Sequence, residues 1–268
     1  LRGDKGWLAV IHADGNGLGK KIMALSKQKF TDDQYKEAFR TVSRSLDKAT
    51  KAAVKKAYAS LEQRYELQKI IIRPIILGGD DLTLIIDGAY ALPFTERYLK
   101  AFEEETRIAF SGVSDNFFGF DGFENGLTAC AGIAYIKPNY PFHYAVDLSE
   151  TLCKWAKNTS RAHSSLMFHK VYSSHVDDFG EVVKRELSTS SYRFDYGPYF
   201  IRPHHSMPTL SQLNNWVSKI KEEGAPASSI RNWLALLKSN ESKAEQLMNR
   251  IRKLKPEYVE ELHLNEVV

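Results

Sequence analysis

The sequence predicts an α+β fold, in which a β-α-β-β-α-β core with one added strand precedes a small all-helical domain. Three observations support this. Short β-branched runs alternate with longer helical runs over about the first 190 residues. A Gly-Gly-Asp-Asp tetrapeptide stands between two of the apolar runs, as the tip of a hairpin does. Beyond residue 205 the pattern is helical, so we expect one domain over 1–205 and a second over 206–268.

The first strand is the apolar run from Trp7 to Asp14, which ends on a carboxylate. A glycine-rich turn, Gly15 to Lys21, follows at once and opens a helical pattern. Free N–H groups and the dipole at a helix N-terminus attract phosphates, so the turn is a candidate phosphate site. A second helix is expected over 33–68, which is rich in Ala, Lys, Glu and Leu.

The hairpin is predicted from runs 70–77 and 82–86, which are short and rich in Ile and Leu. Gly78 and Gly79 permit a tight turn and a close approach to the backbone. Asp80 and Asp81 repel each other at the tip unless a cation lies between them.

The remaining elements continue the alternation. They are a helix over 93–110, an irregular loop over 111–126, a strand over 127–136, a helix over 142–157 and a strand over 165–173. The resulting order is that of a ferredoxin-like core with an extra strand. A linker over 188–208 leads to three helices over 210–221, 228–237 and 242–254, with apolar stripes through Trp216 and Trp233.

The element order predicts where the carboxylates lie. A helical crossover makes the first and second strands parallel, so both end at the same edge of the sheet. Asp14 should therefore meet Asp80 and Asp81 at that edge. Hard oxygen ligands of this kind suit Mg²⁺ or Mn²⁺, and we expect a two-metal site that acts on a nucleoside triphosphate.

Composition narrows the function. The chain has 268 residues, 43% of them hydrophobic, which is enough for a core. A net charge of +4 suits an anionic nucleotide but not a long nucleic-acid track. No apolar run reaches the ~18 residues of a membrane helix, and no secretory signal is visible, so we expect a cytoplasmic protein without a membrane partner. Because the chain starts at Leu1 and enters a strand almost at once, we expect that an N-terminal part is missing.

Four motifs occur in an order that resembles a known family. They are Asp14 to Lys20, Gly78 to Asp81, Ala131 to Ala134, and Ala156-Lys157. Together they resemble the palm domain of the large polymerase-like subunit of type III CRISPR effector complexes, and more distantly GGDEF diguanylate cyclases. The chain could also be a stand-alone relative, such as a minimal CRISPR polymerase.

The resemblance implies a nucleotidyltransferase that condenses ATP into cyclic oligoadenylate second messengers, with a divalent metal and release of pyrophosphate. Asp14, Asp80 and Asp81 are then the catalytic residues and metal ligands. The residues expected to contact nucleotide are Gly15, Asn16, Gly17, Gly19, Gly78, Gly79, Lys157 and Arg161. Lys157 and Arg161 match the basic pair that contacts triphosphate in GGDEF cyclases, and their i,i+4 spacing would place both on one helix face.

Two departures from the family pattern stand out. Asn16 occupies a position where the CRISPR family usually has a second Asp, which leaves one charge fewer near the metals. The metal-dependent nuclease motif and the zinc ribbon that are frequent in the full CRISPR subunit are not found in this sequence.

Three classes of function remain open. The first is the oligonucleotide synthetase; joining two triphosphates would need a second palm, from a homodimer or from a partner within a CRISPR complex that carries guide and target RNA. The second is a palm that binds nucleotide or partner subunits without catalysis, which Asn16 favours and the intact Gly-Gly-Asp-Asp disfavours. The third, a templated polymerase, would need a basic, aromatic-lined cleft that the composition does not indicate.

Overall fold

The computed structural model describes residues 6–27, 30–66, 71–114, 125–172 and 178–264. The chain divides into two compact units: Leu1–Phe179 with Gly197–Met207, and Gly180–Tyr196 with Pro208–Val268. Each unit is described by itself. The domain division at residue 205 stays a prediction.

The first unit alternates strands and helices, as the sequence predicts. In chain order its elements are β1 (Leu8–Gly15), α1 (Leu18–Leu25), α2 (Asp32–Tyr65), β2 (Ile72–Gly78), β3 (Asp81–Asp87), the 3-10 turn η1 (Gly88–Tyr90), α3 (Ala91–Ser114), β4 (Ala129–Ile136), α4 (Phe142–Thr159), β5 (Ser165–Lys170) and β6 (Tyr199–Phe200). These elements confirm the α+β class.

The strands form one sheet in the order β2-β3-β1-β4-β5-β6. β1 is antiparallel to both β3 and β4, and β2 is antiparallel to β3. β1 and β2 are therefore parallel, as expected from the crossover through α1 and α2. The first four positions reproduce the ferredoxin-like core, and β5 extends it in parallel to β4.

β5 is the added strand that the sequence predicts, and the sheet has one strand more, because β6 pairs with β5 at its edge. β6 consists of Tyr199 and Phe200 within the segment expected to be a linker. Two residues are too few to show the alternation of polar and apolar side chains by which a strand is recognised.

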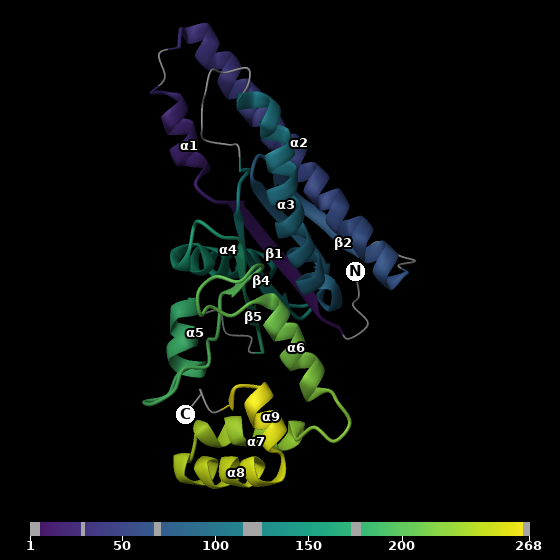
Figure 1. Cartoon of the computed structure of the whole chain (residues 1–268), viewed down its shortest axis with the longest axis vertical. Coiled ribbons are helices and arrows are strands. Elements are labelled where there is room, and N and C mark those ends of the chain that lie inside the picture. Colours follow the sequence, from purple (N-terminus) through teal and green to yellow (C-terminus); the bar gives the residue numbers. More distant parts are fainter. Residues whose placement is uncertain (1–5, 28–29, 67–70, 115–124, 173–177, 265–268) are drawn as a thin grey trace. The chain divides into compact units, whose positions relative to one another are not determined.

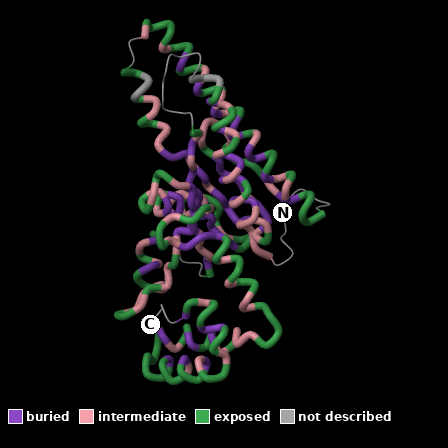
Figure 2. The backbone as a smooth tube through the Cα atoms, in the orientation of Figure 1, coloured by how far each residue is buried: buried purple, intermediate pink, exposed green. Residues whose placement is uncertain are grey.

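Helices cover the sheet on both sides. α4 lies so close to β4 that a Cβ atom on Gly132 would be 1.9 Å from the carbonyl oxygen of Ser149. On the other face α3 packs with its buried aromatic stripe, and α2 runs beside α3 (Figure 1). Figure 2 shows β1, β3 and β4 between these layers largely buried, whereas β2 at the edge of the sheet is mostly exposed. The core of the unit is therefore the sheet and the two helix faces turned toward it.

The helix bounds differ from the predicted ranges by a few residues, as α2 and α3 show. α2 begins after Thr31, which forms a capping box with Gln34. α3 continues to Ser114, so the first part of the loop expected over 111–126 is helical. The segment 115–124 of that loop lies outside the described residues.

The second unit is helical. It contains α6 (Leu210–Ile220), α7 (Ala227–Leu237), α8 (Glu241–Leu254) and α9 (Pro256–Glu261), and most of α5 (Phe179–Glu186). The short helices α5 and α9 were not predicted. Trp233 is buried in the core of the unit with Ile230 and Leu237, whereas Leu234 of the same expected stripe is exposed. In the described part of the chain, no helix combines the length and hydropathy needed to cross a membrane.

Candidate metal and nucleotide site

The site lies where β1 ends beside the tip of the β2–β3 hairpin. Gly78 pairs with Asp81 as the last step of the ladder, so the turn itself is the two residues Gly79 and Asp80. Gly79 has a φ of +61°, a left-handed conformation that glycine adopts without strain. The hairpin prediction is confirmed, with a turn of two residues rather than four.

The strand register brings three carboxylates together. Ala13 of β1 faces Leu82 of β3, so the next residue along β1, Asp14, lies level with Asp81. One carboxylate oxygen from each of Asp14, Asp80 and Asp81 lies within 4.8 Å of the other two. The structure thus shows the convergence expected from the parallel crossover.

Gly15 allows this approach for a steric reason. A Cβ atom at this position would lie 2.9 Å from both Cβ and Oδ2 of Asp80. A side chain on residue 15 would therefore push Asp80 out of the cluster. The sequence predicts contact of this glycine with phosphate, whereas the structure shows that it packs against Asp80.

Lys157 contributes a cation from α4. Its Nζ donates to Oδ2 of Asp14 and, at 3.0 Å, to the carbonyl oxygen of Gly15. The Lys157 side chain is only 11% exposed. The lysine therefore partly neutralises the charge of the cluster through its ion pair with Asp14.

Arg161 does not share a helix face with Lys157. α4 ends at Thr159, and its C-cap Ser160 is extended, so Arg161 lies in the following bend. The i,i+4 argument for this pair is wrong, because the helix stops before its last turn reaches Arg161. Arg161 is exposed, and its contact with nucleotide stays a prediction.

Asn16 is held by the start of β4. Its Nδ2 donates to Oγ1 of Thr128 at 3.0 Å and to Sγ of Cys130 at 3.5 Å. Its backbone N–H donates to the carbonyl of Thr128 at 2.8 Å. The residue is 4% exposed, and its Oδ1 has no hydrogen-bond partner. An aspartate here could not donate either side-chain bond, so the amide has a structural use at this position.

The glycine-rich turn leads into the first turn of α1. Gly17 has a φ of +74°, and a Cβ atom on Gly19 would meet nothing within 4 Å. The described residues thus leave the space beside Gly17 and Gly19 open, and the first turn of a helix has N–H groups without intrahelical partners. This geometry leaves room for a phosphate, although the expected contacts of Gly15, Asn16, Gly17 and Gly19 with nucleotide stay predictions.

Three supporting residues were not singled out in the sequence. Thr50 of α2 donates to the carbonyl oxygen of Gly79 at 2.6 Å and so anchors the hairpin tip. His12 and Thr83 face each other across β1 and β3, with His12 Nδ1 3.0 Å from Thr83 Oγ1. His12 stands two residues before Asp14, and Thr83 stands two residues after Asp81. Because side chains two residues apart on a strand lie on the same face of the sheet, the sequence contains a signal for both residues. The role of Thr50 has no local signal.

Electrostatics of the cluster favour a cation. Burial, followed by the charge of Asp14, raises the pKa of Asp80 to about 6. The same two causes raise the pKa of Asp81. Burial lowers the pKa of His12. The carboxylates thus repel one another and resist ionisation in the protein alone, a repulsion that a bound cation would relieve.

The donor set fits a divalent metal. All three side chains offer hard oxygen atoms, which Mg²⁺ and Mn²⁺ prefer. At ~2.1 Å from Mg²⁺, two ligand oxygens lie up to about 4 Å apart, so small side-chain rotations would bring these atoms onto one ion. Among the residues that the structure describes, this is the one group of three metal-ligating side chains found.

Comparison with solved structures finds similar folds at low identity. A Csm1-Csm4 cassette in complex with cA3 is 13% identical over 97% of this chain and 31% of that chain, with a TM-score of 0.45. The cassette in complex with cA4 is 17% identical over 59% of this chain, with a TM-score of 0.36. The active GGEEF domain of a diguanylate cyclase from Vibrio cholerae is 13% identical over 60% of this chain and 82% of that chain, with a TM-score of 0.34.

The chain spans only 20% of the length of the Csm1-Csm4 chain bound to cA4. No curated protein matches it. The model of one protein family, the second palm domain of Cas10/Cmr2, matches residues 7–165, which include β1, the hairpin and α4. That match extends over more than half of the chain and contains every residue of the carboxylate cluster. The chain therefore belongs to the Cas10/Cmr2 second palm domain family.

Proposed function

We propose that this palm is a metal-dependent nucleotidyltransferase that condenses ATP into a cyclic oligoadenylate second messenger in CRISPR-type antiviral defence. The observation that carries the proposal is the convergence of Asp14, Asp80 and Asp81 within 4.8 Å, beside a glycine-rich turn that opens a helix. Carboxylates at this spacing, next to a helix N-terminus, are suited to a metal–triphosphate complex.

Asp14, Asp80 and Asp81 would hold Mg²⁺ or Mn²⁺. When bound, such ions make a ribose hydroxyl a better nucleophile and neutralise the leaving pyrophosphate. Burial, followed by the charge of Asp14, raises the pKa of Asp80 and of Asp81, and a bound cation would favour the ionised form of both carboxylates. Gly15 keeps the space that Asp80 needs.

The other residues of the site would bind and orient the triphosphate. The N–H groups in the first turn of α1, which follows Gly17, would donate to phosphate oxygens. Lys157 can exchange its bond to Asp14 for a phosphate oxygen once a metal occupies the carboxylates. Gly78 and Gly79 would lie against the nucleotide. Exposed Arg161, in the bend after α4, can turn toward a phosphate from outside the helix.

Ring closure requires two triphosphates in contact. One set of three carboxylates in a single chain provides one such position. A second palm, from another copy or from a CRISPR effector subunit, would supply the other nucleotide.

A second function has one observation in its favour. Asn16 is tied to Thr128 and Cys130, and it adds no negative charge to the cluster. A palm with fewer charged ligands could bind nucleotide or a partner palm without catalysis.

The test is incubation of the purified chain with each NTP and Mg²⁺ or Mn²⁺, with products identified by mass spectrometry. Asp80→Asn/Asp81→Asn removes the charges, and Glu37→Gln, an exposed carboxylate of α2, is the matched control. A cyclic oligonucleotide from the wild type and the control, but not from the double variant, supports the synthetase. Metal-dependent ATP binding without product supports the non-catalytic palm. Absence of any metal-dependent nucleotide binding refutes both.

A further inference from the structure

A pocket of about 320 Å³ lies at the end of the sheet opposite the carboxylates. Trp7 precedes β1, whereas Asp14 stands near the other end of the same strand. Tyr135 and Lys170 lie at the C-terminal ends of β4 and β5, which border the pocket on its second side. The volume falls within the range of small-molecule sites. The proposed synthetase chemistry makes no use of this pocket.

Aromatic rings form its walls. Trp7, Tyr135 and Phe168 all line the pocket. Phe168 meets Tyr135 edge to face at 6.3 Å and stacks on Tyr199 at 5.5 Å, so its ring is held in place from two sides. The Trp7 backbone is fixed by the N–H of Gly88, which donates to its carbonyl at 3.0 Å. The rings therefore present preformed flat apolar surfaces.

Two ammonium groups lie on the Trp7 ring. Lys137 Nζ is 4.0 Å and Lys170 Nζ is 4.1 Å from the ring centroid. Within the described parts of the chain, neither lysine forms an ion pair with a carboxylate. Asp87, the acidic residue of the lining, uses Oδ1 to accept the N–H of Ala89 at 3.0 Å. Because both ammonium groups lie on the same ring, an anion bound beside Trp7 would be attracted by two positive charges.

We propose that this pocket binds one nucleotide unit, with the base against the aromatic walls and the phosphate on Lys137 and Lys170. Flat aromatic surfaces beside cations are the combination by which proteins hold nucleotides of single strands. The volume of the pocket leaves room for a planar base, Lys170 belongs to its lining, and Lys137 reaches the Trp7 ring from outside that lining. The unit can be a free nucleotide or one residue of an RNA strand. The binding needs no metal and no triphosphate, which distinguishes it from the carboxylate site.

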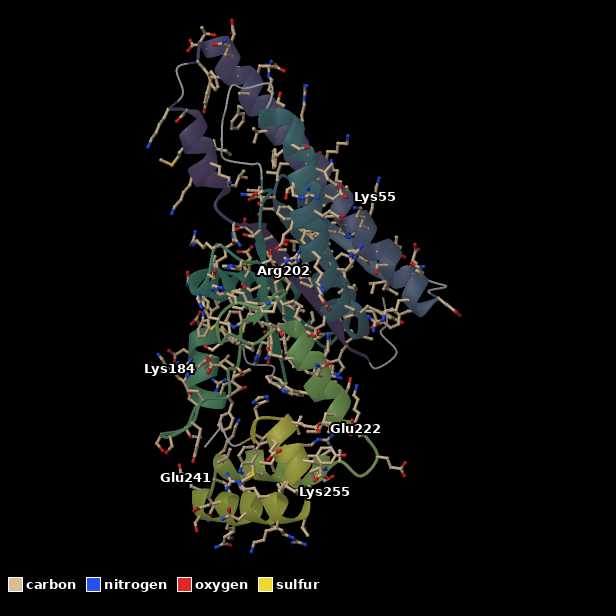
Figure 3. All side chains as sticks on the ribbon, viewed as in Figure 1. Lys55, Lys184, Arg202, Glu222, Glu241 and Lys255 are labelled. Atoms are coloured by element: carbon tan, nitrogen blue, oxygen red, sulfur yellow. The ribbon has the colours of Figure 1, made fainter. Side chains whose placement is uncertain are left out.

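The experiment measures binding of AMP and of hexa-adenylate without a triphosphate, in EDTA, by calorimetry and tryptophan fluorescence. Lys137→Gln/Lys170→Gln removes the cation pair. The matched control, Lys48→Gln/Lys55→Gln, removes two charges from exposed positions of α2, one of which is marked in Figure 3. Trp7→Leu tests the stacking wall, and circular dichroism verifies that each variant is folded.

We expect the cation-pair variant to weaken binding by about tenfold or more, and the control by less than about twofold. Asp80→Asn/Asp81→Asn should bind AMP as the wild type does, so this result is independent of the synthetase proposal. AMP binding that depends on the lysines identifies a free-nucleotide site. If hexa-adenylate alone shows that dependence, the ligand is a strand. Equal binding of the nucleotide probes by the cation-pair variant and the control overturns the proposal. Hexaglutamate serves as an anion without a base, and its lysine-dependent binding, with no binding of AMP or hexa-adenylate, also overturns the proposal.

Discussion

Replacing Asp80 by Asn should stabilise the metal-free protein, although it removes a proposed catalytic residue. The pKa of Asp80 rises from its usual 3.8 to about 6 in the folded protein, chiefly through burial and then through the charge of Asp14. The folded state thus holds the Asp80 proton more tightly than the unfolded state does. An ionised Asp80 therefore lowers the free energy of unfolding, whereas an asparagine of the same shape carries no charge and has no such effect.

The sign and size follow from that shift. Below pH 3.8 the carboxyl is protonated in both states and the penalty is absent, and above about pH 6 the penalty is complete. At 1.36 kcal/mol per unit the shift corresponds to roughly 3 kcal/mol. Because Asp80 is partly open to solvent, we reduce this to about 1–2 kcal/mol.

The assay is urea unfolding of wild type and Asp80→Asn in EDTA at pH 3.5 and pH 7.5, followed by circular dichroism. We expect Asn to gain about 1–2 kcal/mol at pH 7.5 and nothing at pH 3.5. Saturating Mg²⁺ should make the wild type more stable than Asp80→Asn at pH 7.5, because the wild type binds the ion more tightly. Glu37→Gln should show neither effect. A wild type more stable than Asp80→Asn in EDTA at pH 7.5 would refute the repulsion argument.

Three further predictions concern neighbouring residues. Lys157→Met should tighten the binding of Mn²⁺ alone several-fold, because it removes a positive charge beside Asp14, and it should weaken the binding of metal–ATP. Calorimetry gives both dissociation constants. Equal changes in the two constants would contradict the proposal that Lys157 binds first Asp14 and then phosphate. Gly15→Ala should lower the affinity for Mn²⁺, measured by calorimetry, by about tenfold, because the added Cβ would lie 2.9 Å from Asp80. The loss of folding stability should be smaller than this loss of binding, since the hairpin tip that carries Asp80 can shift. Unchanged affinity would mean that the cluster tolerates the methyl group. Gly132→Ala should cost about 3 kcal/mol in urea unfolding, because its Cβ would lie 1.9 Å from the Ser149 carbonyl of α4 and backbone must move; a cost below about 1 kcal/mol would contradict this packing of α4.

The fold was predictable because its signals are local and periodic. The strands of the core, the long helices and the Gly-Gly-Asp-Asp hairpin each leave a pattern within a few residues. β6 and α9 were missed because two and six residues are too short for such a pattern. The i,i+4 argument for Lys157 and Arg161 failed because α4 ends at Thr159, an end that no glycine or proline marks.

The sequence by itself determined that Asp14, Asp80 and Asp81 meet, because a right-handed crossover and a hairpin leave one arrangement for the strand ends. Only the tertiary structure decided which groups surround them. Lys157 reaches Asp14 across 143 positions of sequence, and Asn16 is drawn to Thr128 across 112. Such partners depend on how α4 and β4 pack against β1. Topology can be read from the order of elements, whereas side-chain contacts are settled by packing between distant segments, which no local pattern records.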